Sequence, residues 1–435
     1  MRRLKKCVVR RLQLGVKDVV VLNDVASVRE ALTNPDLLYR PDDFMFSYIG
    51  VKGIVAINGD AWVANRRYCF QVLRNLGFAK KSMEEHIHEE LEGFIDLLES
   101  KKQQPTQISN LLAASLANNI SALIFGQRYD LEDPEGRYFA ALLSTFLRRA
   151  KLFGVMDFLP ALRVIASNIP FTSVRIMNYV ARELKQRVRV AVKERCGNME
   201  HYAERDFIDG YLRKIQENNG TTPHYTLEHL EGNAINFFGP STNLVRTVIL
   251  WNLYIAASDP EGMQARLQGE IDSALGRQRM PMWEDRLHMP YTMAFILETL
   301  RWRSPTPLSL HRIARCDTVI SGYHIPPGTL VVPNFWSLNN DPKEWNNPSQ
   351  FDPTHFLTDN GTKVDEKPSA FVPFSVGRRA CPGETLALME VFLYVTTVLQ
   401  KFRVLPEEGK TLCLDGQHAL LLLVDDTQPL RFILR

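Results

Sequence analysis

The stretch Phe374-Ser-Val-Gly377-Arg-Arg379-Ala-Cys381-Pro-Gly383 places five residue types at fixed offsets around one cysteine. A cysteine thiolate can be the axial ligand of haem iron, onto which it pushes electron density. Glycines let the backbone turn tightly and bring its N–H groups towards the sulfur, where they tune the metal. The stretch therefore predicts a haem-binding loop. Its candidate cofactor-binding residues are Phe374, Gly377, Arg379, Cys381 and Gly383.

Cys381 is the predicted iron ligand in this loop, and an ordinary buried cysteine is the alternative. Free cysteines are usually small apolar core residues. The other cysteines keep that interpretation, because they are scattered and form no CxxC pair or metal-binding spacing; they are Cys7, Cys69, Cys196, Cys316 and Cys413. For Cys381 the match at five positions favours iron ligation. Arg379 carries a guanidinium, which suits a haem carboxylate.

The loop resembles the haem-binding loop of the cytochrome P-450 family, and the resemblance extends over nearly the whole chain. Further stretches similar to animal microsomal members are Asn118–Asp130, Arg205–Leu212, Tyr323–Thr329 and Ala370–Ser375. The resemblance implies a mainly α fold with small β-sheets (α+β), in which one long central helix runs over haem b (iron protoporphyrin IX).

The resemblance also implies how the chain is organised. We expect a single domain over residues 1–435, with β-rich pieces near 14–60 and 305–335, a helical body over 60–300 and the haem-binding loop over 374–383. No Ser/Gly-rich run or internal repeat divides the chain. In the first part we expect two strands around a turn from Leu14 and a helix from Asp24 to Thr33. At the end we expect a helix over Thr385–Gln400 and a strand pair formed by 419–424 and 430–434.

The overall charge is nearly balanced, with 52 basic and 49 acidic residues and a net charge of +3. This balance argues against a nucleic-acid partner. Six unpatterned cysteines fit a reducing compartment.

The basic N-terminus contains no apolar run of the roughly 20 residues that span a bilayer. Microsomal members carry an anchor and a proline-rich hinge before this point, so we expect a truncated start and membrane association without an anchor.

Two further places in the sequence supply candidate ligands for the haem carboxylates. Trp62 and Arg66 lie four residues apart and share a helix face, and both are hydrogen-bond donors only. An aromatic–cation surface pair is the alternative. The family carries a similar Trp-x-x-x-Arg helix, which favours the carboxylate role. Arg312 occupies the position at which the family keeps a basic residue for the other carboxylate, with a solvated arginine as the alternative.

Glu298 and Arg301 lie on one helix face in a strongly apolar segment, which predicts a buried ion pair. An ordinary surface pair, worth about 0.3–0.5 kcal/mol, is the alternative. In the family this motif has a third partner from a later Pro-x-Arg-Phe segment. The corresponding segment here is Phe351–Phe356, with His355 in place of the arginine. We expect His355 to complete the network by hydrogen bonding.

The central helix, over Leu230–Ala257, departs most from the family pattern. Residues Pro240–Val245 align with Ala-Gly-x-Asp/Glu-Thr-Thr, so Asn243 replaces the acid and Leu244 replaces the alcohol that helps to deliver protons to bound dioxygen. Pro240 removes a backbone donor and predicts a kink. Losing a positioned general acid–base group costs about 10²–10⁴ in rate. The candidate catalytic residues are therefore Thr242 and Asn243, relaying protons through ordered water.

The resemblance implies a monooxygenase that inserts one oxygen atom from O₂ into a lipophilic molecule. Electrons would come from NADPH through a separate flavoprotein reductase, at the cytoplasmic face of the endoplasmic reticulum membrane.

No phosphate-binding glycine fingerprint is present, so we expect the chain itself to bind no nucleotide. Candidate reductase-docking residues, with solvated surface charge as the alternative, are Arg67, Lys80, Lys81 and Arg378. Mostly apolar segments are expected to face the substrate: 44–57, 152–171, 236–244, 304–311 and 417–422.

Two other functions stay open at this point. The changes at Asn243 and Leu244 also suit a haem-thiolate isomerase or dehydratase, which acts on a peroxide and needs no proton relay for O–O cleavage. The second alternative is a catalytically impaired, truncated form that keeps the haem.

Overall fold

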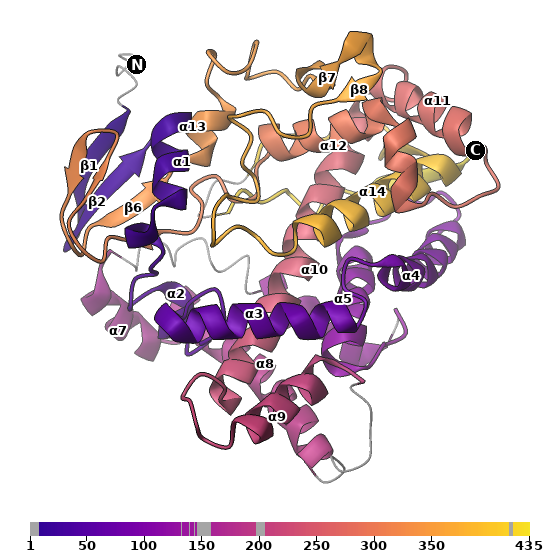
Figure 1. Ribbon diagram of the computed structural model, residues 1–435. Coiled ribbons are helices and arrows are strands. Elements are labelled where there is room, and N and C mark those ends of the chain that lie inside the picture. The colour runs from indigo at the N-terminus through magenta and orange to yellow at the C-terminus, as the bar shows by residue number, and fades with distance from the viewer. Residues whose placement is uncertain are drawn as a thin grey trace.

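The computed structural model describes residues 8–131, 133–138, 140–142, 144–145, 158–196, 205–416 and 421–435. Helices dominate, and the strands form small sheets, as Figure 1 shows. The prediction of a mainly α fold with small β-sheets is confirmed.

The helices lie mostly between residues 59 and 302 and again after the cysteine loop. Their bounds are α1 Val25–Thr33, α2 Met45–Tyr48, α3 Gly59–Asn75, α4 Lys81–Ser100, α5 Ser109–Phe125, α7 Pro160–Asn168, α8 Ser173–Cys196, α9 Phe207–Asn218, α10 Leu227–Ser258, α11 Met263–Leu275, α12 Pro290–Trp302, α13 Phe335–Asn339 and α14 Glu384–Lys401. The predicted helices at 24–33, 230–257 and 385–400 correspond to α1, α10 and α14. No helix in the described part of the chain is long and apolar enough to cross a bilayer.

The main sheet has the strand order β1-β2-β6-β3 and lies to one side of the helical body (Figure 1). The strand bounds are β1 Val9–Leu14, β2 Lys17–Leu22, β3 Arg312–Ile313, β4 Thr318–Ile320, β5 Tyr323–Ile325, β6 Leu330–Pro333, β7 Leu357–Thr358, β8 Lys363–Val364, β9 Phe402–Pro406 and β10 Leu430–Leu434. The β1–β2 hairpin turns at Gly15, whose φ of +58° suits glycine. Beside it, β2 and β6 pair in parallel.

Two expectations about strands need correction. The expected β-rich piece near 14–60 contains strands only as far as Leu22, because Asp24 caps a helix by accepting a hydrogen bond from Ser27 N. The expected closing pair is also different, since β10 pairs with β9, Phe402–Pro406. Of the expected partner strand 419–424, residues 419 and 420 lie outside the described residues, and 421–424 belong to none of the described strands. Strand β9 begins directly after α14, so the end of this helix fixes where β9 lies and where β10 can pair with it.

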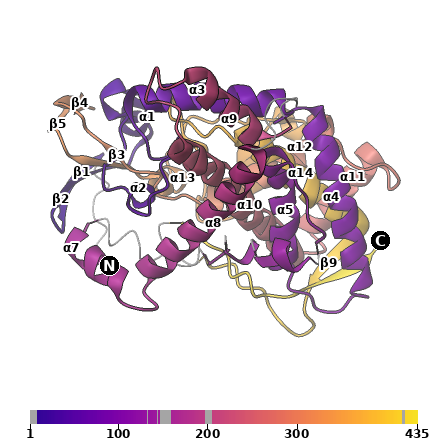
Figure 2. The ribbon, with the colours of Figure 1, turned by 90° about the horizontal axis from the view of Figure 1, so that it is seen from below.

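Helix α10 runs through the middle of the helical body and packs against α5, α8, α9, α12 and α14, and Figure 2 shows it between its neighbours. Most of its residues are buried all round, as a central helix requires. Pro240 lies inside this helix and is exposed, whereas its neighbours Gly239 and Ser241 are partly buried. Of residues 240–244, the helix therefore buries only Thr242 and Asn243.

Candidate active site

The loop 374–383 is closed by its own backbone. Cys381 N donates to Phe374 O at 2.7 Å, and Ala380 N donates to Gly377 O at 3.0 Å. Gly377 has a φ of +77°, and a Cβ atom there would lie 2.5 Å from the Leu32 carbonyl oxygen. Only glycine fits such a position without strain. The loop leads directly into α14, whose first residue is Glu384.

The Cys381 side chain is accessible, yet burial raises the pKa of its thiol. The two observations are compatible, because a side chain can be open to solvent on one side and still have many protein atoms around it. The backbone N–H of Gly383, hydrogen-bonded to the thiol, and the charge of Arg66 partly offset this rise in the pKa. These groups favour a thiolate, the form that binds a metal.

Four arginines form a cluster next to this loop: Arg40, Arg312 and Arg379, which are buried, and Arg66, which is partly buried. Burial, together with the charges of Arg312 and Arg66, lowers the pKa of Arg379 to about 9. Burial and the Arg66 charge lower the pKa of Arg312 to about 10. Burial also lowers the pKa of Arg40, with Arg312 and Arg379 contributing. Like charges gathered in a buried place repel one another, so this cluster favours an anion.

Carbonyl dipoles rather than carboxylates surround the cluster. Arg379 donates to Leu38 O (2.9 Å), Ile54 O (3.0 Å), Ile57 O (2.8 Å) and Asn58 Oδ1 (3.1 Å). Among the described residues, no aspartate or glutamate contributes to the shifted pKa of any of the four arginines. Within the described chain, no carboxylate is thus found to offset the positive charge of the cluster.

Two members of the site have buried donors without partners. Trp62 Nε1 has no hydrogen-bond partner in the described structure, and neither do Nε and Nη1 of Arg312. Buried N–H groups are nearly always paired in folded proteins. The Arg379 guanidinium lies over the Trp62 ring, 4.0 Å from its centroid, and Arg66 Nη2 donates to Ala380 O at 2.7 Å. These donors therefore converge beside the cysteine loop with capacity for a carboxylate.

The structure brings most of the predicted cofactor residues together. Trp62 and Arg66 come from α3, Arg312 from β3, and Phe374, Gly377, Arg379, Cys381 and Gly383 from the loop before α14. Sequence reasoning missed Arg40, which donates to Val55, Leu310 and His311 carbonyls. No local pattern marks Arg40 in the sequence, because its role depends on residues far away in the chain.

The predicted burial of the Glu298–Arg301 pair is confirmed. Both side chains are fully buried on α12, and Arg301 Nη2 lies 2.6 Å from Glu298 Oε1. Arg301 also donates to the carbonyls of Asn339, Pro348 and Gln350. The pair therefore ties α12 to the segment that precedes the cysteine loop.

His355 is the third member of this network. Its Nδ1 lies 3.1 Å from Glu298 Oε1, and its Nε2 faces the Asn346 carbonyl oxygen. Both neighbours are acceptors, and a neutral imidazole has only one N–H. The geometry therefore favours the doubly protonated ring. The hydrogen bond to Glu298 raises the pKa of His355 accordingly.

This raised pKa predicts a loss of stability at alkaline pH. The contribution of His355 is fully present below the pKa of about 6.5 expected for an unfolded histidine. It is lost as pH rises through the higher pKa of the folded state. We expect the free energy of unfolding of the wild type to fall over this range relative to that of His355→Leu, measured by denaturant unfolding at several pH values. Parallel pH profiles of the two proteins would contradict this expectation.

Comparison of the sequence with known proteins shows which family it matches. The cytochrome P450 family profile matches residues 1–430. Cytochrome P450 2F3 of Capra hircus is 35% identical over 408 residues, which cover 90% of this chain and 80% of that protein. Cytochrome P450 2C25 of Mesocricetus auratus is 34% identical over 398 residues, with the same coverage. Cytochrome P450 2J2 of Homo sapiens is 33% identical over 416 residues, which cover 93% of this chain and 80% of that protein.

The chain belongs to the cytochrome P450 family. It is a haem-thiolate monooxygenase that acts on lipophilic substrates, and it binds haem, its substrate, O₂ and a redox partner. Its likeness to these mammalian enzymes indicates association with the endoplasmic reticulum.

The residues of this P450 fit the haem that the family requires. The accessible Cys381 sulfur suits an axial iron ligand, and the unpaired N–H groups of Trp62 and Arg312 suit the haem's carboxylates. Haem, when bound, supplies the iron centre at which O₂ is activated. Towards this haem, Cys381 would supply the thiolate, and the arginines of the cluster would supply positive charge for its two carboxylates.

In this P450 the predicted catalytic residues Thr242 and Asn243 are both buried in α10. The Thr242 hydroxyl donates to Phe238 O, 3.1 Å away, within its own helix. Asn243 Oδ1 has no hydrogen-bond partner in the described structure. Neither side chain is hydrogen-bonded to the cysteine loop in the described contacts. The structure therefore leaves Asn243, rather than Thr242, with free hydrogen-bonding capacity.

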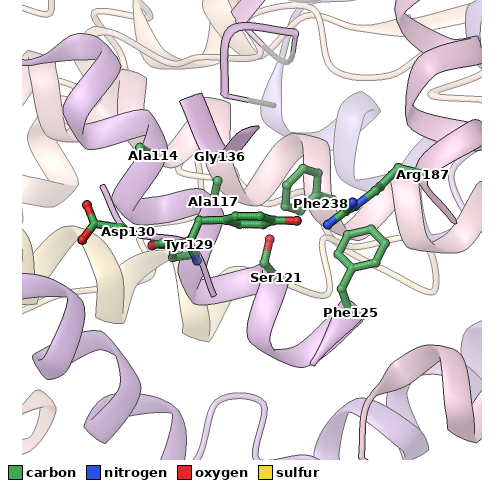
Figure 3. Close-up of a pocket in the computed structure, with 10 residues that line it drawn as sticks. Ala114, Ala117, Ser121, Phe125, Tyr129, Asp130, Gly136, Arg187 and Phe238 are labelled. Carbon is green, nitrogen blue, oxygen red and sulfur yellow. The ribbon is translucent and has the colours of Figure 1, made fainter. Parts of the chain in front are cut away.

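A separate small cavity lies between α5, α8 and α10. Its lining residues are Ala114, Ala117, Asn118, Ser121, Phe125, Tyr129, Asp130, Gly136, Arg187 and Phe238, most of which Figure 3 labels. It contains neither Cys381 nor any member of the arginine cluster. Of the segments expected to face the substrate, it includes only Phe238 of 236–244; residues 152–157 and 417–420 lie outside the described residues. This cavity is therefore distinct from the haem site.

Proposed function

We propose that Cys381 is the thiolate ligand of haem b, and that Trp62, Arg66, Arg312 and Arg379, together with Arg40, hold its two carboxylates. The observation that carries this proposal is the buried arginine cluster, which among the described residues has no acidic partner. The two carboxylates of a porphyrin are opposite in sign to such a cluster and would complement it. Within the loop, Gly377 and Gly383 give the backbone its turn, and Phe374 closes it through its carbonyl oxygen.

We propose that Asn243 holds the water that delivers protons during O₂ activation, with Thr242 as a secondary member. Asn243 has a buried, unpartnered carbonyl oxygen and lies three residues after the exposed Pro240. Leu244 carries no hydroxyl, and Asn243 is its neighbour in the sequence.

This role of Asn243 predicts a large effect on turnover. We expect Asn243→Leu to lower the rate of O₂-dependent product formation by about 10²-fold or more, the range for a lost positioned proton relay. The rate of oxidation driven by an added peroxide serves as the internal comparison, since that oxygen donor already carries a proton. Equal losses in both assays would show a packing defect instead.

We propose an NADPH-dependent flavoprotein reductase as the redox partner. Exposed basic side chains at Arg67, Lys80, Lys81 and Arg378 support this proposal, because Arg67 lies on α3 and Arg378 lies in the cysteine loop. The Arg378 guanidinium is 5.7 Å from the centroid of the Trp62 ring, which places exposed positive charge next to the haem site. An acidic partner surface would complement these charges.

We propose that the protein lies on the cytoplasmic face of the endoplasmic reticulum membrane and contacts it through an exposed apolar patch. The patch comprises Leu14, Val16, Leu162, Val164, Ile165, Ile169 and Phe171. Phe171 is 89% exposed, which is costly for an aromatic side chain in water. Val16 N donates to Phe158 O, so the β1–β2 turn and α7 are neighbours (Figures 1 and 2).

We also propose that residues 1–435 form one domain. One hydrophobic cluster contains residues from Met45 to Phe432 and includes side chains of α3, α10 and α14. Such a continuous core leaves no boundary at which the chain would divide.

A comparison of two assays tests the function. With a flavoprotein reductase and NADPH, we expect loss of a lipophilic substrate and incorporation of one oxygen atom from O₂ into the product. With a lipid hydroperoxide and no reductant, we expect no rearrangement at a comparable rate. Rearrangement without reductant would favour the isomerase, which the Pro240–Leu244 sequence also suits. Haem binding with neither activity would identify the impaired form.

A further inference from the structure

The central helix α10 is connected to the arginine cluster by a pair of asparagines. Asn233 Oδ1 accepts a hydrogen bond from Ile54 N at 2.8 Å. One turn later, Asn236 Oδ1 accepts from Val55 N at 3.0 Å. Asn233 is fully buried and Asn236 is nearly so. The loss of a hydrogen bond between buried groups is costly in free energy, so α10 firmly holds the segment 53–57, which contains Ile54 and Val55.

The same two residues, Ile54 and Val55, bind the arginines through their carbonyl oxygens. Ile54 O accepts from Arg379 Nη1 at 3.0 Å, and Val55 O accepts from Arg40 Nε at 3.2 Å. Each of these two residues is thus bonded to an asparagine of α10 through its N–H and to a cluster arginine through its carbonyl. A shift of the segment would move both acceptors at once.

Close backbone packing holds the segment against α10. A Cβ atom on Gly232 would lie 2.4 Å from Gly53 N, and one on Gly53 would lie 2.4 Å from the Gly232 carbonyl carbon. No side chain fits between these two backbones. The contact leaves the segment at 53–57 no room to approach α10 in another way.

Asn233 also reaches the helix that carries the other half of the site. Its Nδ2 donates to Asn65 Oδ1 at 2.8 Å, and Asn65 lies between Trp62 and Arg66 on α3. Tyr211 OH donates to the same oxygen, and Asn65 Nδ2 donates to Ala61 O and His224 O. Asn65 is therefore fully hydrogen-bonded, and its position depends on Asn233.

We propose that Asn233 is a positioning residue, which holds the arginine cluster in the geometry that binds the haem carboxylates. Arginine side chains are long and would move towards water to escape one another's charge. Asn233 opposes this movement from two sides, through Ile54 for Arg379 and through Asn65 for α3. The inference rests on the proposed carboxylate-binding role of the cluster.

A comparison of Asn233→Leu with Asn252→Leu tests the proposal. Asn252 is an equally buried asparagine of α10, whose Nδ2 donates to Val248 O and whose Oδ1 accepts from Thr299. It has no contact with the cluster in the described structure. Both changes leave buried polar groups unpaired and should lower the free energy of unfolding to a similar extent. Two readouts separate them: the rate of haem loss to an acceptor protein, and the reduction potential of the iron.

We expect Asn233→Leu to accelerate haem loss about tenfold, the equivalent of one lost hydrogen bond to a charged group. We also expect it to lower the reduction potential, because arginines that move away stabilise the reduced iron less. Asn252→Leu should leave both readouts near the wild type. Tyr211→Phe, which removes one bond to Asn65 at little cost in volume, should shift them in the same direction as Asn233→Leu but less.

Equal haem loss from the Asn233 and Asn252 variants would overturn the proposal, because it would reduce Asn233 to a structural role. Arg312→Leu distinguishes this outcome from a failure of the carboxylate-binding role. If Arg312→Leu accelerates haem loss and Asn233→Leu does not, only the positioning inference is wrong. If Arg312→Leu has no effect, the proposed function of the cluster is wrong as well.

Discussion

Cys381→Ala is expected to abolish the thiolate-type Soret band of the reduced carbonyl complex and all monooxygenase turnover. Alanine has no atom that can bind iron, so the change removes the predicted axial ligand. The haem carboxylates would still meet the arginine cluster, so we expect some haem to remain bound. Absorption spectra of the reduced carbonyl complex and a turnover assay measure the two effects.

Cys69→Ala is the matched control for this change. Cys69 is a free, fully buried thiol of α3, and burial raises its pKa well above that of an ordinary cysteine. Its removal should cost stability through a small cavity but leave the spectrum unchanged. A thiolate-type spectrum in the Cys381 variant would refute the assignment of the ligand.

Arg301→Met is expected to destabilise the protein by about 3–5 kcal/mol, because it leaves the Glu298 carboxylate buried and without its main charge partner. It also leaves three carbonyl groups without the Arg301 donors. A loss of this size is a large part of the stability of a typical domain. We expect little soluble holoprotein at 37 °C, and denaturant unfolding at low temperature measures the loss.

Lys410→Met provides the comparison for this second change. Lys410 pairs with Glu407 at the same i,i+3 spacing and at 2.7 Å, but its side chain is 63% exposed. Removing an exposed pair costs at most about 1 kcal/mol. If both variants lost the same small amount of stability, the buried pair would not support the fold as we infer.

Much of the local structure was predictable because it depends on residues close together in the chain. The Asp24 cap, the helical pattern of α10 and the α14 helix after Cys381 all follow from spacing and capping chemistry. The pairing of β10 was not predictable in this way. Its partner β9 directly follows the end of α14, whereas the apolar run at 419–424 led to a different prediction.

The residues of the site also fall into two groups, those that a short sequence pattern predicted and those that only tertiary contacts revealed. The sequence motif identified Cys381, and the resemblance identified Trp62, Arg66 and Arg312, because each belongs to a short pattern. Arg40 and Asn233 belong to none, and their roles appear only from contacts with Val55, Ile54 and Asn65. The same applies to the protonation of His355, which depends on two acceptors that the fold places on either side of its ring.

The sequence by itself determined the family and the unusual Pro240–Leu244 segment and predicted Cys381 as the iron ligand, since these are statements about residue types at short spacings. Only the tertiary structure decided how the positive charge is arranged and held. Four arginines from separate parts of the chain lie together, three of them buried, and α10 holds the residues whose carbonyl groups bind Arg40 and Arg379. The physical reason is that charge repulsion and hydrogen-bond geometry depend on distances in space, which spacing along the chain does not specify.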